Sequence, residues 1–404
     1  MSRLALTSIA AMTAAIATSA ASFAASIDRV ENDQANSAPV DATVEIDAVT
    51  TEIATTIATA QSNSAGGSFA SEAEVTSTQV TDGATSATTG IEADSVWGLS
   101  TGFATAQGNA LTVDAENGLA MDAGQTAGAG ASVSALSALR LNTYGGNTAQ
   151  SAMATANAVE VMGSGNMPMN VRQSSEADVE ARSQIEAEEV ETALATAQSA
   201  GNSLTVTGYE ANIIALADQE NSGNVRSTVD ADIAHANWGV TAMSEAAGNT
   251  ASTQNDWGYG HLQGSQTNSG EVRATTTLAV GTFGDGPVVG SSHAVGNNAL
   301  VSNIGADAFS GVTQNNSGAV TGQVSMQLGT GMAAYGTSSA IGNAQSAYIC
   351  ATCPVGLNAQ VNQVNSGAIS SITQMQANGY VGGMTGTATA VGNVSTFSTI
   401  GGGN

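Results

Sequence analysis

The chain has 404 residues, with 33 acidic side chains against seven basic ones, a formal net charge of −26. The basic residues are all Arg and are not clustered, which excludes nucleic acid as a partner because phosphate binding needs grouped cations. Aromatic residues make up 4% of the chain and Gly is abundant, so large core-filling side chains are scarce. The composition therefore allows a fold with a thin core, or disorder.

The first 24 residues read as a secretory signal peptide. Arg3 precedes an apolar stretch over residues 4–16, and a segment of small residues offers a cleavage site after Ala24. The stretch is too short to span a membrane, and no Cys follows it as in a lipoprotein. An N-terminal amphipathic helix is the alternative. We expect an exported protein.

Two polar residue types recur with a nearly constant period over the rest of the chain. Gln recurs every 45 to 49 residues, at Gln34, Gln79, Gln125, Gln173, Gln219, Gln266, Gln314 and Gln363. Asn recurs every 45 to 50 residues, at Asn63, Asn109, Asn157, Asn202, Asn249, Asn297, Asn343 and Asn393. A period this stable is typical of a repeat architecture.

Each series lies in a short motif. The Gln motif is Q-x-N-S-G-x-V, complete from Gln219 to Val225. Asn-Ser-Gly indicates a turn, because Asn and Gly tolerate positive φ. The Asn motif is A-x-G-N, as at residues 294–297, and its Gly indicates a bend or a close approach of two backbones.

Residues after the Asn-Ser-Gly turn alternate with the period of a β-strand. In repeat five, Val225, Val229 and Ile233 share one face, whereas Arg226 and Asp230 share the other. This pattern predicts strands with one dry face.

The Glu-rich residues 176–196 could form a helical insertion or an acidic strand face. Gln173 and Asn202 keep the period on either side of this segment, which favours the strand.

The prediction for the fold class is all-β: a β-solenoid of about eight repeats of roughly 47 residues. A single repeat cannot bury its apolar face, but stacked copies share one core. Stacking would align equivalent amides into hydrogen-bonded ladders. The predicted ladder residues are Gln219, Gln266, Gln314, Gln363, Asn249, Asn297, Asn343 and Asn393. Whether each repeat winds one coil or two stays open.

Three segments follow from the period. Residues 1–24 are the signal peptide, residues 25–393 hold the eight repeats, and residues 394–404 form a Gly-rich tail. The repeats start near residues 34, 79, 125, 173, 219, 266, 314 and 363.

Cys350 and Cys353 form a C-x-x-C where the Asn-to-Gln segment lengthens, which indicates an inserted loop. A redox motif would need a βαβ setting, and a zinc site would need a second pair of ligands. In an exported protein we expect a local disulfide.

No catalytic centre, metal site or cofactor is predicted. His235, His261 and His293 occupy different phases of the repeat, and the Asp and Glu residues are scattered. Lyase or hydrolase chemistry would need converging carboxylates or a neighbouring base. We therefore expect no enzyme.

Charged side chains are absent from the C-terminal part of the chain. Asp307 is the last acid and Arg273 the last base, so the C-terminal repeats lack the repulsion that keeps β-rich surfaces apart. We expect self-association or partner binding through these repeats.

The phrases Gln314-Asn315-Asn316-Ser317-Gly318 and Ala294-Val295-Gly296-Asn297, together with the long repeat and the Lys-free body, resemble the holdfast attachment protein HfaD family of stalked alphaproteobacteria. A more distant resemblance links the spaced Gln, Asn and Gly to curlin repeats. The HfaD resemblance implies a surface protein that fixes an adhesive polysaccharide to the outer membrane, beside a curli-like protein and a secretion pore. The alternative is a self-assembling functional-amyloid or biofilm-matrix subunit.

Overall fold

The computed structural model describes residues 27–351 and 355–401. The predicted signal peptide and Cys353 lie outside these ranges. Every regular element within them is a β-strand, which confirms the all-β prediction, and none of their residues form a helix that could cross a membrane. The strands are β1 (Asp28–Asn36), β2 (Val40–Phe69), β3 (Ala73–Thr81), β4 (Ala84–Ala115), β5 (Leu119–Ala127), β6 (Ser132–Ser175), β7 (Asp178–Asn221), β8 (Val225–Asp256), β9 (Gly260–Asn268), β10 (Val272–Phe283), β11 (Val288–Ile304), β12 (Ala308–Asn316), β13 (Val320–Ala351), β14 (Leu357–Ala359), β15 (Asn362–Asn365), β16 (Ile369–Ala377) and β17 (Val381–Gly401).

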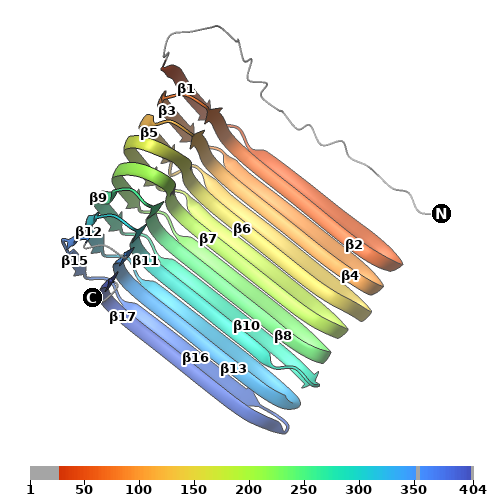
Figure 1. Cartoon of the computed structure of the whole chain (residues 1–404). Helices are drawn as coiled ribbons and strands as arrows, with labels where there is room; N and C mark the ends of the chain where they lie inside the picture. Colours follow the sequence, from red (N-terminus) through yellow and green to blue (C-terminus); the bar gives the residue numbers. More distant parts are fainter. Residues whose placement is uncertain (1–26, 352–354, 402–404) are drawn as a thin grey trace.

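Each strand between the first and last layers pairs in parallel with the strands one repeat before and after it. Val272 of β10 lies opposite Val225 of β8 on one side and Val320 of β13 on the other. Each repeat therefore contributes one layer, and the layers follow one another in chain order (Figure 1). The first layer consists of β1 and β2, and the last of β14 to β17.

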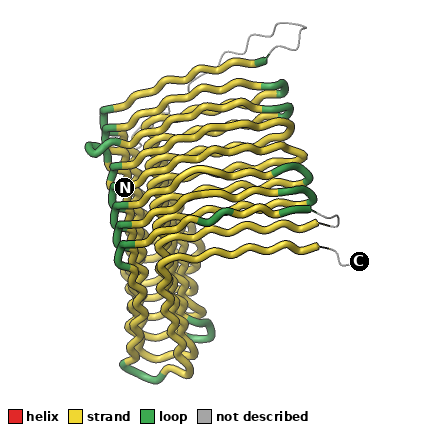
Figure 2. Tube along the Cα trace, turned by 90° about the vertical axis from the view of Figure 1, so that its left-hand side faces the viewer, coloured by secondary structure: helices red, strands yellow, loops and turns green. Residues whose placement is uncertain are grey.

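Each layer has two arms that meet at a corner (Figure 2). In the long arm, the chain runs out to a tip and returns, and the inward side chains of the two stretches form one apolar core. A second core fills the shorter arm, with Leu204 and Ile213 among its buried residues. Within the long arm, Ser137 Oγ donates to Gln150 Oε1 across the core at 2.7 Å.

The long arm thus consists of two sheets packed face to face. We call the first the outgoing sheet, formed by residues 40–48, 85–93, 133–141, 179–187, 225–233, 272–280, 320–328 and 369–377. We call the second the returning sheet, formed by residues 53–61, 99–107, 147–155, 192–200, 239–247, 288–295, 333–341 and 383–391.

The predicted alternation is confirmed in repeat five. Val225, Val229 and Ile233 are fully buried, whereas Arg226 is exposed. The Glu-rich segment also follows this pattern within β7, so it is the predicted acidic strand and not a helix.

The Gly of Asn-Ser-Gly has a different role from the one predicted. Gly223, Gly270 and Gly318 do not have positive φ. Instead, a Cβ added to Gly270 would lie 2.0 Å from the carbonyl oxygen of Gly223 in the layer below. Backbones of adjacent layers approach too closely here for a side chain. The Gly of A-x-G-N also marks a close approach, since a Cβ on Gly296 would lie 2.5 Å from Gly342 O.

The C-terminal strand extends further than the sequence indicates. Residues 394–401, predicted to begin a Gly-rich tail, continue β17 and pair with β13 as far as Gly401. The open edge of β13 offers unpaired backbone groups at each of these positions. The segment also contains Val394, Phe397 and Ile400, residue types that favour strands, so the Gly-rich part of the predicted tail begins only at Gly401.

Candidate functional site

The predicted Gln residues lie together in the corner between the arms. The Nε2 of each later Gln donates to the Oε1 of the Gln one layer earlier. The distances are 2.8 Å from Gln266 to Gln219, 2.8 Å from Gln314 to Gln266 and 2.7 Å from Gln363 to Gln314. The second Nε2 hydrogen reaches a backbone carbonyl, as from Gln266 to Asn298 O at 2.8 Å. Both amide hydrogens are therefore used in a buried position.

The predicted Asn residues form a second ladder beside the first, and its hydrogen bonds point the opposite way along the stack. Each earlier Asn donates its Nδ2 to the Oδ1 of the next one. The distances are 2.8 Å from Asn249 to Asn297, 2.8 Å from Asn297 to Asn343 and 2.7 Å from Asn343 to Asn393. Asn249, Asn297 and Asn343 are fully buried. These amides replace the hydrogen bonds to water that burial removes.

A third ladder was missed by the sequence reasoning. Asn221, Asn268, Asn316 and Asn365 bond Nδ2 to Oδ1 at 2.7 to 2.8 Å. They are the Asn of Asn-Ser-Gly, whose predicted role was turn formation alone. Their spacing of 47, 48 and 49 residues was the available signal.

The remaining singled-out residues do not meet in one place. Cys350 is exposed at the end of β13, and its predicted bond to Cys353 stays a prediction. His235 contacts Thr282 at 2.6 Å, and His261 stacks on Phe309 with ring centroids 4.5 Å apart. Within the described ranges, no group of three or more His, Cys, Asp or Glu residues is placed to hold a metal ion.

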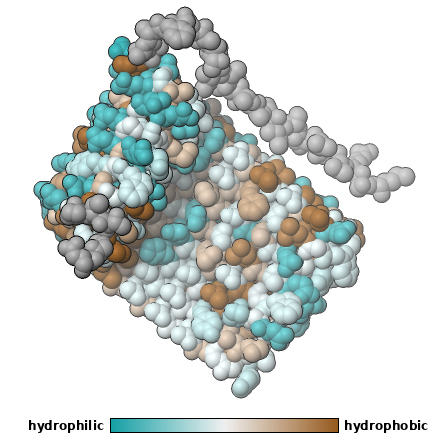
Figure 3. All heavy atoms as spheres, viewed as in Figure 1, coloured by the Kyte–Doolittle hydropathy of each residue, from teal (hydrophilic) through white to brown (hydrophobic). Residues whose placement is uncertain are grey.

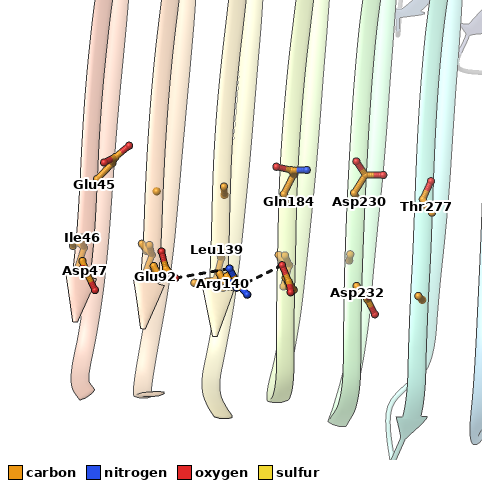
Figure 4. Close-up of a pocket in the computed structure, with 17 residues that line it drawn as sticks. Glu45, Ile46, Asp47, Glu92, Leu139, Arg140, Gln184, Asp230, Asp232 and Thr277 are labelled. Atoms are coloured by element: carbon orange, nitrogen blue, oxygen red, sulfur yellow. Dashed lines mark ion pairs between the residues drawn. The ribbon is translucent and has the colours of Figure 1, made fainter. Parts of the chain in front are cut away.

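The outer face of the outgoing sheet carries a shallow acidic groove that crosses several layers (Figure 4). Arg140 lies in its middle, 4.0 Å from Glu92 Oε1 and 3.8 Å from Glu186 Oε2. The charged residues that line the groove are Glu45, Asp47, Glu92, Arg140, Glu186, Asp230 and Asp232. Six carboxylates against one guanidinium leave a strong excess of hydrogen-bond acceptors, which suits cationic or hydroxyl-rich ligands.

A second hollow adjoins this groove on the side that faces the tip of the long arm. Arg140, Glu186 and Asp232 line both, and Asn142 and Glu188 continue towards the tip. The two hollows therefore form one continuous acidic surface that runs towards the tip.

Aromatic side chains and acids meet at this tip. Trp97 and Tyr144 pack with ring centroids 5.0 Å apart, and the Tyr144 hydroxyl donates to Glu191 Oε1 at 2.9 Å. Burial, and next the hydrogen bond to Glu191, raise the pKa of Tyr144. Trp97 and Trp238 are 62% and 56% exposed, which is unusual for large apolar rings. We call Trp97, Tyr144, Glu191 and Trp238 the tip cluster.

The returning sheet presents an outer face of opposite character. Its ranges contain Glu245 as the single charged residue, and Ile57, Phe103 and Met243 are exposed on it. Figure 3 shows an arm face that is pale, with apolar patches and few strongly hydrophilic side chains. The two faces of the long arm thus differ sharply in charge.

These surfaces on a stack of repeated layers define an all-β protein with one acidic face and aromatic residues at the tip of its long arm. The family model for holdfast attachment protein D matches residues 46–319, more than half of the chain, so the chain belongs to that family. The predicted family resemblance is confirmed, and the protein is a surface protein related to holdfast attachment. Searches of curated proteins and of solved structures find no match.

Proposed function

We propose that the protein is an exported adhesion protein that folds as a β-solenoid of eight repeats and anchors an adhesive polysaccharide at the outer membrane. Family membership supports the attachment role. The observation that supports a polysaccharide ligand is the position of the acidic groove: with its neighbouring hollow it runs towards the end of the long arm that bears the tip cluster. Exposed Trp rings beside carboxylates offer a sugar both an apolar face and hydrogen-bond acceptors.

The negative charge of the groove limits which polysaccharides can bind there. The groove carries six acids and one Arg, so uronic-acid polymers would be repelled. Ammonium groups would be attracted, and neutral hydroxyls would find carboxylate acceptors. The ligand class is therefore a neutral or amine-bearing glycan.

A binding experiment with purified protein tests this role. Three immobilised polymers serve as probes: an N-acetylated amino sugar polymer, its partly deacetylated form and a uronic-acid polymer. We expect retention on the first two and none on the third. The double variant Trp97→Ala with Trp238→Ala should lose at least tenfold in affinity.

Trp257 provides the matched control, because it is 57% exposed but lies between β8 and β9, at the end of the short arm. Trp257→Ala should bind like the parent chain. Equal losses in the tip and control variants, or a preference for the uronic-acid polymer, would refute the proposed binding face.

The proposed role is binding, with no catalytic step and no cofactor. A curli-like surface protein and a secretion pore are the proposed further partners, and nucleic acid is not one. The alternative function, a self-assembling matrix subunit, is favoured by one observation: both ends of the described stack present open strand edges, β1 and β2 at one end and β14 to β17 at the other.

A further inference from the structure

The three amide ladders have a direction, and the described end layers carry complementary ladder ends. Inside the stack each Gln donates towards the N-terminal end, whereas each Asn donates towards the C-terminal end. In the first layer, Gln34 Nε2 donates to Ser64 O alone among described acceptors. In the last layer, Gln363 Oε1 faces the open edge and accepts from Ser395 Oγ at 3.1 Å.

We infer that the last layer of one copy of this chain stacks in register on the first layer of a second copy. In this arrangement Gln34 of the second copy donates to Gln363 of the first, continuing the Gln ladder. Asn393 of the first copy donates to Asn63 of the second, as each internal Asn does with its neighbour. The inference does not depend on the proposed polysaccharide role.

The direction of the ladders excludes contacts between two identical end layers. Two first layers brought together would set Gln donors against Gln donors, and two last layers would set Asn donors against Asn donors. Their strands would also no longer run parallel in the register that the layers use. A head-to-tail contact that repeats without closing generates a filament.

The cores also match in this register. Val40, Ile46 and Ala48 of the first layer are only partly buried against the long-arm core. In the last layer, Ile369, Met375 and Ala377 are also only partly buried against this core. The repeat register places Ile369 over Val40, Met375 over Ile46 and Ala377 over Ala48. Stacking would therefore bury two incomplete apolar rows against each other.

The outward side chains are complementary as well. The first layer carries exposed acids and the last layer exposed amides at the same repeat positions. Gln374 would lie beside Glu45 and Gln376 beside Asp47, so each amide can donate to a carboxylate. In the short arm, Gln360 and Asn362 would lie beside Glu31 and Asp33. Uncharged amides opposite acids remove the repulsion that two acidic edges would have.

Cysteine cross-linking tests the register in a chain whose Cys350 and Cys353 are replaced by Ser. Asp47→Cys with Gln376→Cys would place the two thiols on adjacent strands, with Cα atoms about 4.8 Å apart across the contact. Within one chain they are seven layers apart, on the order of 34 Å, so no intramolecular bond can form. Oxidation should give a series of dimers, trimers and longer species that grows with protein concentration.

The matched control moves one cysteine by two residues on the same face. With Asp47→Cys and Gln374→Cys the Cα atoms would be roughly 8 Å apart, beyond disulfide reach. We expect at least a tenfold lower cross-linking yield. Absence of oligomers from the in-register pair, or equal yields from both pairs, would overturn the inference.

Charge variants give a second, independent measurement by light scattering, without any polysaccharide. Gln374→Glu with Gln376→Glu would oppose carboxylates to Glu45 and Asp47 and should shorten the assemblies. Gln374→Lys with Gln376→Lys at the same positions should lengthen them at low salt. Assembly that responds equally to both substitutions would contradict the proposed contact.

Discussion

Trp97 and Tyr144 belong to successive layers, yet their rings pack 5.0 Å apart at the tip of the long arm. Tyr144 continues the contact into the next layer through its hydrogen bond to Glu191. Residues spaced by one repeat thus form a single cluster because each layer lies directly on its neighbour.

The first prediction concerns the titration of Tyr144. Its pKa is raised by burial and then by Glu191, so ionisation should occur above the ordinary value of about 10. A raised phenol pKa contributes stability below the ordinary value, and this is lost as the pH rises through the folded-state pKa. Glu191→Gln should lower the pKa, but only partly, because burial remains.

Ultraviolet difference titration measures this change, with Tyr144→Phe used to identify the signal. Glu245→Gln, in the returning sheet, serves as the control and should leave the titration unchanged. A rise in the Tyr144 pKa in Glu191→Gln would contradict the hydrogen bond from the Tyr144 hydroxyl to Glu191.

The second prediction concerns the Gln ladder. Gln266→Met keeps the length of the side chain but removes the donor to Gln219 and the acceptor for Gln314. Buried polar groups left without partners cost about 1 to 3 kcal/mol each, so we expect a loss of about 2 to 5 kcal/mol. Urea unfolding measures it.

Gln263→Met is the matched control, since Gln263 is exposed on the same strand β9. It should change the free energy of unfolding by less than about 0.5 kcal/mol. Similar effects of the two substitutions would show that the ladder does not stabilise the stack.

The third prediction concerns the close approach at Asn-Ser-Gly. In Gly270→Ala the new Cβ would meet Gly223 O at 2.0 Å, so the layers must move apart. Overpacking of this kind costs about 1 to 3 kcal/mol. Gly124→Ala is the control, because nothing lies within 4 Å of its added Cβ. It should be neutral or stabilise slightly. Thermal unfolding that ranks Gly124→Ala as the worse variant would contradict this reading.

The period of the sequence was sufficient to predict the strands and which of their side chains point inward. It also predicted that equivalent Gln and Asn residues of successive repeats lie side by side. It could not predict two arms, because alternation looks the same in both arms and the chain turns the corner inside a continuous strand, as at Asn249 in β8. The turn role given to Asn221 hid the third ladder. The spacing of 47 residues from Trp97 to Tyr144, Glu191 and Trp238 was visible in the sequence. Their association at a tip depends on where each strand bends, which the pattern does not encode.

The last prediction concerns the charge of the acidic groove and rests on one ion pair. Asp230 lines the groove and accepts from Arg182 Nη2 at 3.0 Å. Both side chains are more than a third exposed, so the pair contributes little to stability. Its effect should instead appear in binding of the partly deacetylated amino sugar polymer. Asp230→Asn removes an acceptor and leaves Arg182 to repel ammonium groups, so affinity should fall several-fold.

Arg182→Gln supplies the opposite test, because it frees the Asp230 carboxylate and should raise affinity at low salt. The increase should disappear at high ionic strength, where exposed charges are screened. Glu160→Gln, an exposed acid in the short-arm part of β6, is the matched control for net charge and should behave like the parent chain. If all three substitutions change binding in proportion to net charge alone, the polymer responds to the acidity of the whole protein and the groove is not its binding site.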